Sequence, residues 1–152
     1  MTPEVRAPRD AAEYEAALEL RWRILRAPWG QPRGSERDAL DGDAVQRVVV
    51  EAGRVLATGR LHRLDDATGQ IRYMAVEANR RGRGLGRLLL RSLEQAAREA
   101  GLDRIVLHAR EASVAFYEHA GYRLLGPSHT LYGEIRHWRM EKHLPPNTPA
   151  NT

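Results

Sequence analysis

The chain has 152 residues, of which 42% are hydrophobic, and it contains no cysteine. This length predicts a single domain with its own core, and the missing thiols exclude disulfides and thiolate metal sites. The formal net charge of +4 allows a nucleic-acid partner, a polyanionic small ligand or a compositional bias. No apolar run approaches the roughly 20 residues of a membrane span, and the start of the chain lacks the apolar segment of a signal peptide. We therefore expect a cytoplasmic protein with no membrane partner.

The histidines are scattered along the chain, and no two of the six stand four residues apart. A helical two-histidine metal site is therefore not predicted, and no metal is expected. The basic residues are scattered as well, except for a local group of arginines at 80–87, and Lys142 is the only lysine. A group of that size suits a phosphate pocket better than a surface that follows a nucleic-acid duplex.

The first predicted element is a helix over 10–26. Asp10 is a suitable N-cap, and Glu13 stands three residues later, as in a capping box. Leu18, Trp22 and Leu25 form its apolar stripe. Prolines and glycines break the following stretch, in which 35–40 is expected to form one helical turn and 41–43 a turn. This irregular stretch is either a substrate-contacting loop or a plain connector.

A three-strand meander is predicted next. Segments 46–52 and 54–64 read as strands that form an antiparallel hairpin at Gly53, and the turn 65–69 leads to a strand over 71–76. Gly59, inside the second strand, indicates either a bulge or close packing.

The rest of the chain alternates strands and helices. A helix over 84–100, stopped at Gly101, leads to a strand over 104–108, so the strands on either side of this helix are expected to be parallel. The remaining elements are expected to be a short helix over 111–120, a strand over 122–125 that Gly126-Pro127-Ser128 ends, a last strand over 134–143 and a disordered tail over 145–152.

The stretch 71–101 predicts an anion site, because a strand, a glycine-rich basic turn and a helix follow one another without a break. The first N–H groups of a helix have no intrahelical partner, and its macrodipole places partial positive charge there. Glycines let a phosphate approach the backbone. The phosphate-loop motif G-x-x-x-x-G-K-[ST] and the dinucleotide motif G-x-G-x-x-G are both absent from this turn. The arginines that would add charge are Arg80, Arg81, Arg83 and Arg87.

Two motifs carry a resemblance to a known family. Residues 81–86, RGRGLG, resemble the R/Q-x-x-G-x-G/A acyl-CoA signature of the GNAT superfamily of N-acyltransferases, and residues 116–122, FYEHAGY, resemble its later F-Y-x-x-x-G-F/Y segment. The resemblance covers roughly 46–143, and the first helix more loosely. Residues 133–140 are similar to the G-I-P-H-x-x-M ending of ElaA-like bacterial members, with Arg136 in place of proline. Arg110 stands where the family often has asparagine.

The resemblance implies an α/β (α+β) fold over a single domain at 1–144. Its central sheet would be mixed and mostly antiparallel, with a parallel strand pair that splays apart and helices on both faces. It also implies acetyl-CoA as co-substrate. The pantetheine arm would bond the backbone near Met74, Ala75 and Val76, and Phe116 would join the cofactor-binding residues. The pyrophosphate would meet N–H groups of Arg81, Gly82, Arg83, Gly84, Leu85 and Gly86.

The implied reaction is direct attack of a primary amine on the acetyl-CoA thioester. A backbone N–H around Met74 to Ala75 is the candidate donor to the oxyanion. By resemblance Tyr117 gives the departing thiolate its proton; the alternative is that Tyr117 is only a core aromatic residue. His137 is the chosen general base, although a histidine on a strand is more often structural. Its alternatives are His62, Glu36, Glu134 and a chain of water molecules.

Two other functions stay open at this point. One is a catalytically idle GNAT domain that binds acyl-CoA, and the other is a basic nucleic-acid-binding module, for which no interleaving of aromatic and basic residues is present. Arg80 and Arg83 are either phosphate ligands or solvated surface charges. The expected acceptor is a small-molecule or peptide amine of unspecified identity, and a homodimer is left open.

Overall fold

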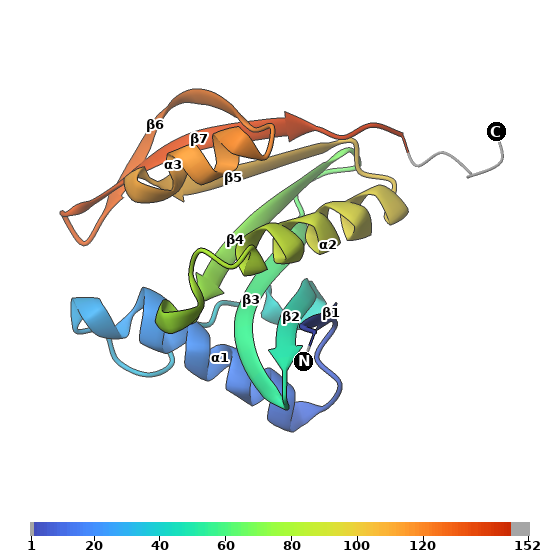
Figure 1. Cartoon of the computed structure of the whole chain (residues 1–152). Helices are drawn as coiled ribbons and strands as arrows, with labels where there is room; N and C mark the ends of the chain where they lie inside the picture. The colour runs from blue at the N-terminus through green and yellow to red at the C-terminus, as the bar shows by residue number, and fades with distance from the viewer. Residues whose placement is uncertain (1, 147–152) are drawn as a thin grey trace, which may run out of the picture. The chain divides into compact units, whose positions relative to one another are not determined.

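The computed structural model describes residues 2–146, so the predicted disordered tail lies outside the described residues from position 147 on. Seven strands form one sheet in the order β1-β2-β3-β4-β5-β7-β6. Neighbouring strands pair antiparallel at every described register except β4 with β5, which is parallel. The predicted mixed, mostly antiparallel sheet with one parallel pair is therefore confirmed (Figure 1).

The chain divides into two compact units, which are described separately. Unit 1 comprises the residues up to His62 together with Ile71–Leu93, and unit 2 comprises Arg63–Gln70 with the residues from Glu94 onward. The single domain over 1–144 stays a prediction. The elements up to the second long helix are β1 (Glu4–Arg6), α1 (Ala11–Leu25), the 3₁₀ turns η1 (Ala27–Trp29) and η2 (Asp41–Asp43), β2 (Val45–Glu51), β3 (Arg54–Arg63), β4 (Thr68–Val76), η3 (Ala78–Arg80) and α2 (Leu85–Glu99).

Helix α1 begins where the sequence predicts, but the predicted capping box does not form. The Asp10 carboxylate accepts the backbone N–H of Glu13 (2.9 Å), so the N-cap is confirmed. Glu13 does not return a bond to the N-cap residue. Its carboxylate accepts instead from the Arg9 N–H (2.8 Å) and from the guanidinium of Arg6. The competing partner comes from β1, a three-residue strand that sequence patterning missed.

The buried face of α1 is wider than the predicted stripe. Leu18 and Leu25 are buried as expected, but Trp22 is only half-buried. The guanidinium carbon of Arg33 lies over the Trp22 ring, 4.1 Å from the ring centroid. Leu20 and Arg21, which lie beside the stripe, are almost fully buried. Burial of a charged Arg21 requires partners from the loop that follows α1.

That loop does not contain the predicted helical turn at 35–40. Residues 33–36 form turns, and the regular pieces of the loop are the 3₁₀ turns η1 at its start and η2 at Asp41–Asp43, where only a turn was expected. The path of the loop is set instead by hydrogen bonds to a buried arginine. The Arg21 guanidinium donates to the Glu36 carbonyl and to the Asp41 carboxylate, both at 3.0 Å.

The β2–β3 hairpin is confirmed. Its turn residues Ala52 and Gly53 have φ values of 51° and 78°, the left-handed pair of a type I′ turn. In β3, a Cβ added at Gly59 would lie 2.7 Å from the Met74 sulfur and 3.1 Å from Leu93, so close packing explains this glycine.

Strand β4 begins three residues earlier than predicted. The Asp65 carboxylate accepts the N–H groups of Ala67 and Thr68 at 2.9 and 2.8 Å, which shortens the turn and lets β4 pair with β5 from Thr68. Further along, Tyr73 has φ 58°. A left-handed conformation costs a residue with a side chain about 1–2 kcal/mol, so the surroundings must hold Tyr73 there.

Helix α2 ends as its glycine predicts. Gly101 has φ 80° and donates its N–H to the Arg98 carbonyl (3.0 Å), while Leu102 donates to the Ala97 carbonyl (2.9 Å). This pair of bonds is a Schellman motif, and it leads directly into β5.

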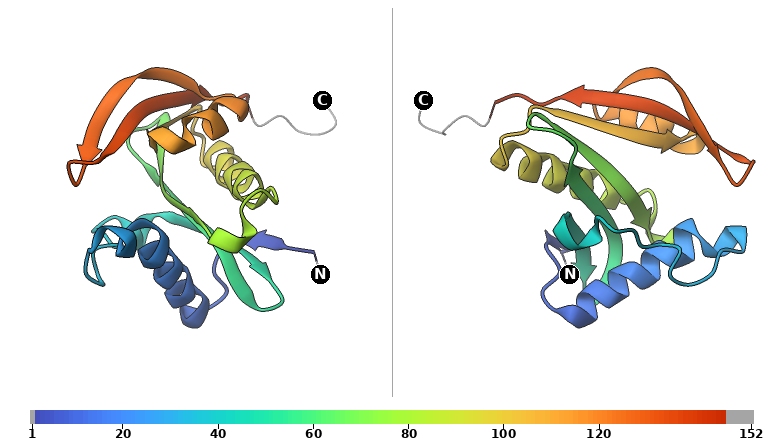
Figure 2. Two further views of the ribbon diagram at one scale, coloured as in Figure 1. Left: turned by 60° about the vertical axis from the view of Figure 1, so that its left-hand side comes forward. Right: turned by 180° about the vertical axis from the view of Figure 1, so that it is seen from behind.

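The second unit contains the strands β5, β6 and β7 and the start of β4, and α3 lies against this part of the sheet (Figures 1 and 2). The predicted end of a strand at Gly126-Pro127-Ser128 is wrong: β6 continues through these residues with shifts of register. The proline is tolerated because β6 is the last strand in the sheet order and needs no donor on its outer side. The elements of this part are β5 (Arg104–Arg110), η4 (Glu111–Ser113), α3 (Val114–His119), β6 (Arg123–Leu131) and β7 (Ile135–His143).

Candidate active site

In unit 1, the predicted cofactor-binding backbone forms one short connection from β4 to α2. The N–H of Glu77 donates to the Leu56 carbonyl (2.8 Å), which fixes the end of β4. The carboxylate of Glu77 accepts hydrogen bonds from both terminal nitrogens of Arg23, each at 3.0 Å. The turn η3 follows, and the chain then reaches the exposed residues 81–84. Met74, Ala75 and Val76 are thus held a few residues before the glycine-rich turn.

The glycines of the turn are required by backbone conformation rather than by crowding. Gly82 and Gly84 have φ values of 82° and 78°, and a Cβ added at either would meet no atom within 4 Å. Leu88 donates its N–H to the Gly84 carbonyl (3.0 Å), so the N–H groups just before Leu88 precede the first helical bond. The turn therefore presents open backbone N–H groups. Leu85 is buried and anchors the start of α2.

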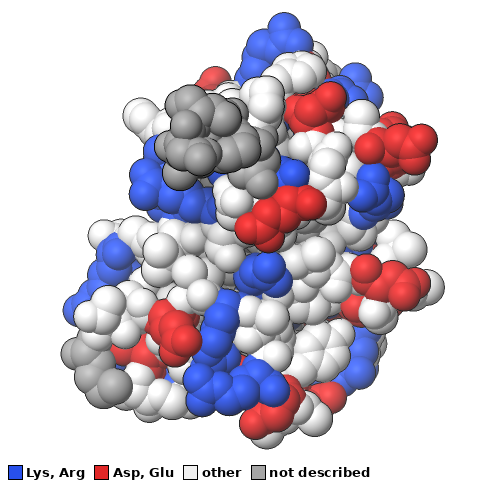
Figure 3. Space-filling model, turned by 90° about the vertical axis from the view of Figure 1, so that its right-hand side faces the viewer, with Lys and Arg blue, Asp and Glu red and all other residues white. Residues whose placement is uncertain are grey.

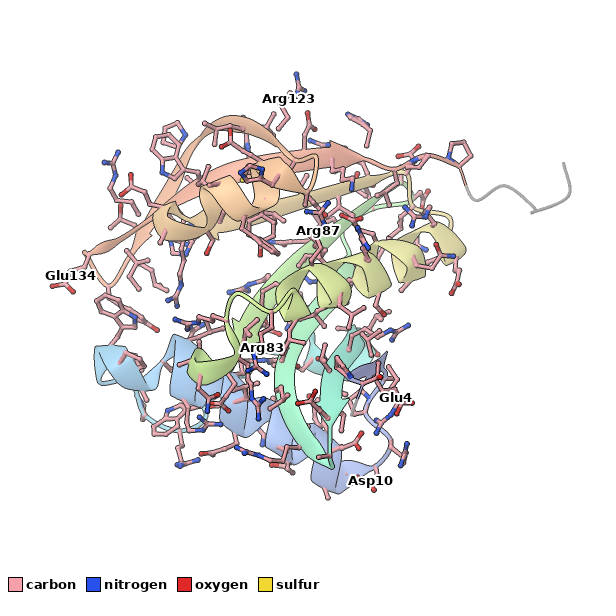
Figure 4. The ribbon with its side chains drawn as sticks, in the orientation of Figure 1. Glu4, Asp10, Arg83, Arg87, Arg123 and Glu134 are labelled. Carbon is pink, nitrogen blue, oxygen red and sulfur yellow. The ribbon has the colours of Figure 1, made fainter. Side chains whose placement is uncertain are left out.

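The arginines of the turn divide into two kinds. Arg80 pairs with Glu51 at 3.5 Å and is partly buried, so it contributes to the fold of unit 1. Within the described part of the chain, Arg81, Arg83 and Arg87 make no ion pair and no side-chain hydrogen bond. Arg83 lies in the turn and Arg87 on the first turn of α2 (Figure 4). Three guanidinium groups without internal partners are what an anionic ligand needs.

In unit 2, Tyr117 is a buried residue of α3 with 7% exposure. Its ring meets Phe116 and Tyr122 edge-on, with centroids 5.0 and 5.6 Å away. Burial raises the pKa of Tyr117 well above the ordinary value of 10. The phenol therefore keeps its proton at neutral pH, which suits a proton donor as well as a core residue.

A buried ion pair fixes the end of α3. Lys142 Nζ donates to both oxygens of Glu94, at 3.1 and 3.2 Å, and to the Ala120 carbonyl at 2.9 Å. The Tyr122 hydroxyl donates to the same carboxylate at 2.8 Å. Glu94 is 4% exposed, so its carboxylate is largely removed from water, while Lys142 is partly exposed. Through these bonds α2 and β7 together hold the residue that ends the Tyr117 helix.

His137 lies buried on β7. Its Nδ1 is 2.9 Å from the Ile135 carbonyl, so Nδ1 carries the hydrogen and Nε2 carries the lone pair in the neutral ring. The ring stacks on His129 with centroids 4.4 Å apart. Burial lowers the pKa of His137 below 6.5; the hydrogen bond to the Ile135 carbonyl opposes this, while the nearby His129, Arg110 and His108 lower the pKa further. The ring is therefore neutral at pH 7, as a general base must be.

The alternative bases differ in how their lone pairs are used. His62 is buried, and its Nδ1 lies 3.2 Å from the Arg60 guanidinium, which can only donate. Glu36 is also buried and accepts from the Gly34 N–H (2.8 Å). Glu134 projects at the tip of the β6–β7 hairpin (Figure 4). His137 therefore remains the first choice within its own unit.

Two further properties bear on the class of site. Among residues 2–146, no group of three or more histidine, aspartate or glutamate side chains is arranged to hold a metal ion. In the same part of the chain no helix is long and apolar enough to cross a bilayer.

Sequence patterning missed two sets of residues around these sites. Glu94, Tyr122 and Lys142 form the support of α3, and their spacing of 20 to 28 residues gives no local signal. The other set surrounds Tyr73 in unit 1. The only hint of it was a pair of aspartates at 38 and 41 in an otherwise irregular loop.

The mixed sheet with its single parallel strand pair is the fold expected of an acetyltransferase, and sequence comparison gives this class. Residues 14–122 match the family model described as the acetyltransferase (GNAT) family. The chain belongs to this family and is an acetyltransferase.

Individual relatives support this assignment. The uncharacterized N-acetyltransferase YjcF of Bacillus subtilis (strain 168) is 31% identical over 130 residues, which span 86% of this chain and 92% of the relative. The crystal structure of a putative N-acetyltransferase from Lactobacillus plantarum is 25% identical, with a TM-score of 0.83 over 95% of this chain and all of the other. ElaA of Escherichia coli is 18% identical with a TM-score of 0.78, over 93% of this chain and 99% of ElaA. That last similarity shows the fold alone, so membership of an ElaA-like branch stays a prediction.

The ion pair behind α3 leads to a stability prediction. Lys142→Met removes the charge and leaves the buried Glu94 carboxylate without its cation. We expect the free energy of unfolding to fall by about 2–3 kcal/mol, toward the lower end for a broken buried pair because Lys142 is partly exposed. Urea denaturation measures the change. Arg139→Met, at an exposed position of the same strand, is the matched control and should stay within about 0.5 kcal/mol of wild type. Equal stabilities of the two variants would contradict the assigned role of Lys142.

Proposed function

We propose that this acetyltransferase moves an acetyl group from acetyl-CoA to a primary amine by direct attack. The observation that carries the proposal is the turn at 81–86, with two left-handed glycines and free arginines before the N-terminus of α2. Family membership supports the acyl donor and the amine acceptor as classes.

The residues proposed to bind the pyrophosphate and the pantetheine amides of acetyl-CoA lie in unit 1. The open N–H groups from Arg81 to Gly86 and the positive end of α2 suit a pyrophosphate, and Arg83 adds a charge-assisted contact. The backbone of Met74, Ala75 and Val76 would hydrogen-bond the pantetheine amides. Phe116 on α3, in unit 2, would supply an apolar contact.

The chemistry needs three groups from the protein. As the amine nitrogen bonds to the thioester carbon, the carbonyl oxygen gains negative charge, which the N–H of Met74 or Ala75 would stabilise. When the carbon–sulfur bond breaks, the Tyr117 hydroxyl would give its proton to the sulfur. The raised pKa of Tyr117 means that the phenol still carries its proton at neutral pH when the thiolate develops, although burial also makes it a weaker acid than an exposed tyrosine.

The third group takes a proton from the amine. His137 is our choice, because its Nε2 lone pair is available in the neutral ring and its lowered pKa keeps the ring neutral. His62, Glu36, Glu134 and a chain of water molecules remain the alternatives. The acceptor is a small-molecule or peptide amine, and a homodimer remains open.

A nucleic-acid-binding function has less support. On the face shown in Figure 3, basic and acidic side chains are interspersed and form no continuous basic surface. A catalytically idle acyl-CoA-binding domain would share the glycine-rich turn, and turnover measurements separate it from an enzyme.

We predict that Gly84→Val weakens acetyl-CoA binding by tenfold or more, about 1.4 kcal/mol. Valine is strained at φ 78°, and its branched side chain would cover the N–H groups that meet the phosphates. Isothermal titration with acetyl-CoA measures the affinity. Gly101→Val is the matched control, since Gly101 has φ 80° and open space but lies at the far end of α2. Equal affinities of the folded Gly84→Val protein and wild type would rule out the turn as the phosphate site.

We predict that Tyr117→Phe lowers kcat by about two to four orders of magnitude, the usual contribution of a general acid. Phenylalanine keeps the ring packing but removes the proton. KM for acetyl-CoA should change little, because the proton is needed only as the sulfur leaves. Thiol release with a good amine acceptor measures the rate, and Tyr14→Phe on α1 is the control. A wild-type kcat in Tyr117→Phe would assign Tyr117 to packing.

We predict an acid limb in the pH profile of kcat/KM with its midpoint below pH 6.5. The pKa of His137 lies below its ordinary value of 6.5, so the base is mostly neutral above that pH and becomes protonated as the pH falls through the lowered pKa. His137→Gln should reduce the rate and remove this limb. If the limb persists unchanged in His137→Gln, another of the candidate bases accepts the proton.

A further inference from the structure

Tyr73 combines a strained backbone with a position next to the proposed oxyanion donor. Its φ of 58° places it in the left-handed region, although it lies inside β4 and is not glycine. The residue is 8% exposed and packs in a buried cluster with Leu20, Leu25 and Ala75. Strain of this kind persists only where neighbouring groups hold it.

The ring of Tyr73 is surrounded by guanidinium groups, and we call this set the arginine cage. The cage residues approach from α1, its C-cap, β3 and β4 itself. Two of them, Arg21 and Arg60, are almost completely buried, and their Nε–H groups have no hydrogen-bond acceptor among residues 2–146. The tyrosine π-face therefore provides part of their stabilisation. The guanidinium carbons of Arg21, Arg72, Arg60 and Arg26 lie 4.3, 4.6, 4.8 and 5.6 Å from the ring centroid.

Asp38 ties the cage to the Tyr73 hydroxyl. One of its oxygens accepts from the Tyr73 hydroxyl and from Arg72, both at 3.2 Å, and the other accepts from Arg60 at 2.5 Å. Burial opposes ionisation of Asp38, but the bonds from Arg60 and the Leu40 N–H hold its pKa at about 2. The carboxylate is thus charged at neutral pH. It holds the Tyr73 hydroxyl directly, and it holds the ring through Arg60 and Arg72, which lie over the ring.

We propose that Tyr73 is a positioning residue: the arginine cage and Asp38 hold it left-handed and so orient the peptide N–H of Met74 toward the thioester oxygen. The inference rests on the proposed function for its catalytic meaning. A change from left-handed to ordinary strand geometry alters ψ by roughly 90°, which turns the following N–H through about a quarter of a circle. A residue held in one of these states gives a preorganised donor.

The chain offers a direct probe of this N–H. It contains three methionines, at positions 1, 74 and 140, so labelling with [¹⁵N]methionine reports the amide in question together with very few others. Met140, on β7 in unit 2, is the internal reference, and Met140→Leu assigns its signal. We expect one sharp Met74 amide signal in wild type, which shifts when acetyl-CoA is added.

Tyr73→Gly is the main variant, because glycine accepts the same φ but leaves the cage without a ring. We expect its Met74 signal to broaden or double while Met140 is unchanged, and kcat to fall by ten- to a hundredfold with acetyl-CoA affinity within threefold of wild type. Tyr73→Phe keeps the ring and should retain most of the wild-type kcat. Val48→Ala, in a separate buried cluster, lowers stability without touching the cage and should retain kcat.

Arg72→Leu is a second variant in case Tyr73→Gly does not fold, since the Arg72 side chain is 42% exposed. It should move the Met74 signal and lower kcat three- to tenfold. A wild-type Met74 signal and kcat in either folded variant overturns the proposal. Its failure is distinct from that of the proposed function, which would show as no turnover and no acetyl-CoA shift in wild type, whereas the cage is tested on the free protein.

Discussion

Unit 1 depends on the neutralisation of one buried charge. Arg60 is fully buried in β3, and an arginine cannot lose its proton to reduce the cost of leaving water. Asp38 and Asp41 approach its guanidinium to 2.5 and 2.9 Å. Both aspartates lie in the irregular stretch after α1, so the course of that loop is set by electrostatics rather than by helix or turn propensity. The same arrangement surrounds Tyr73 and holds its strained backbone.

Unit 2 has a similar constraint around Glu94. A carboxylate on the buried face of α2 is stabilised by the chain's single lysine and by the Tyr122 hydroxyl. The lysine also bonds the carbonyl at the end of α3, so neutralising Glu94 fixes the short helix that carries Tyr117. In each unit, a buried ion network thus holds a piece of backbone next to a residue of the proposed chemistry.

Local rules of sequence were reliable where one residue type decides the backbone. Gly101 closes α2 in a Schellman motif, and Gly53 closes the β2–β3 hairpin. The same rules failed where partners come from elsewhere in the chain. Glu13 pairs with Arg6 of β1 and does not complete the capping box. Pro127 did not end β6, because an edge strand tolerates a missing donor.

The sequence by itself determined the family, the order of most helices and strands, and the glycine-rich turn, because these depend on periodicity and on contiguous motifs. It also gave Tyr117 by resemblance and His137 as one choice among several candidate bases. Only the tertiary structure decided that burial raises the pKa of the first and lowers that of the second. It alone revealed the left-handed Tyr73 and its cage. Those properties depend on charges and rings brought together from positions as far apart as Arg21 and Tyr73, and no local pattern encodes such a distance.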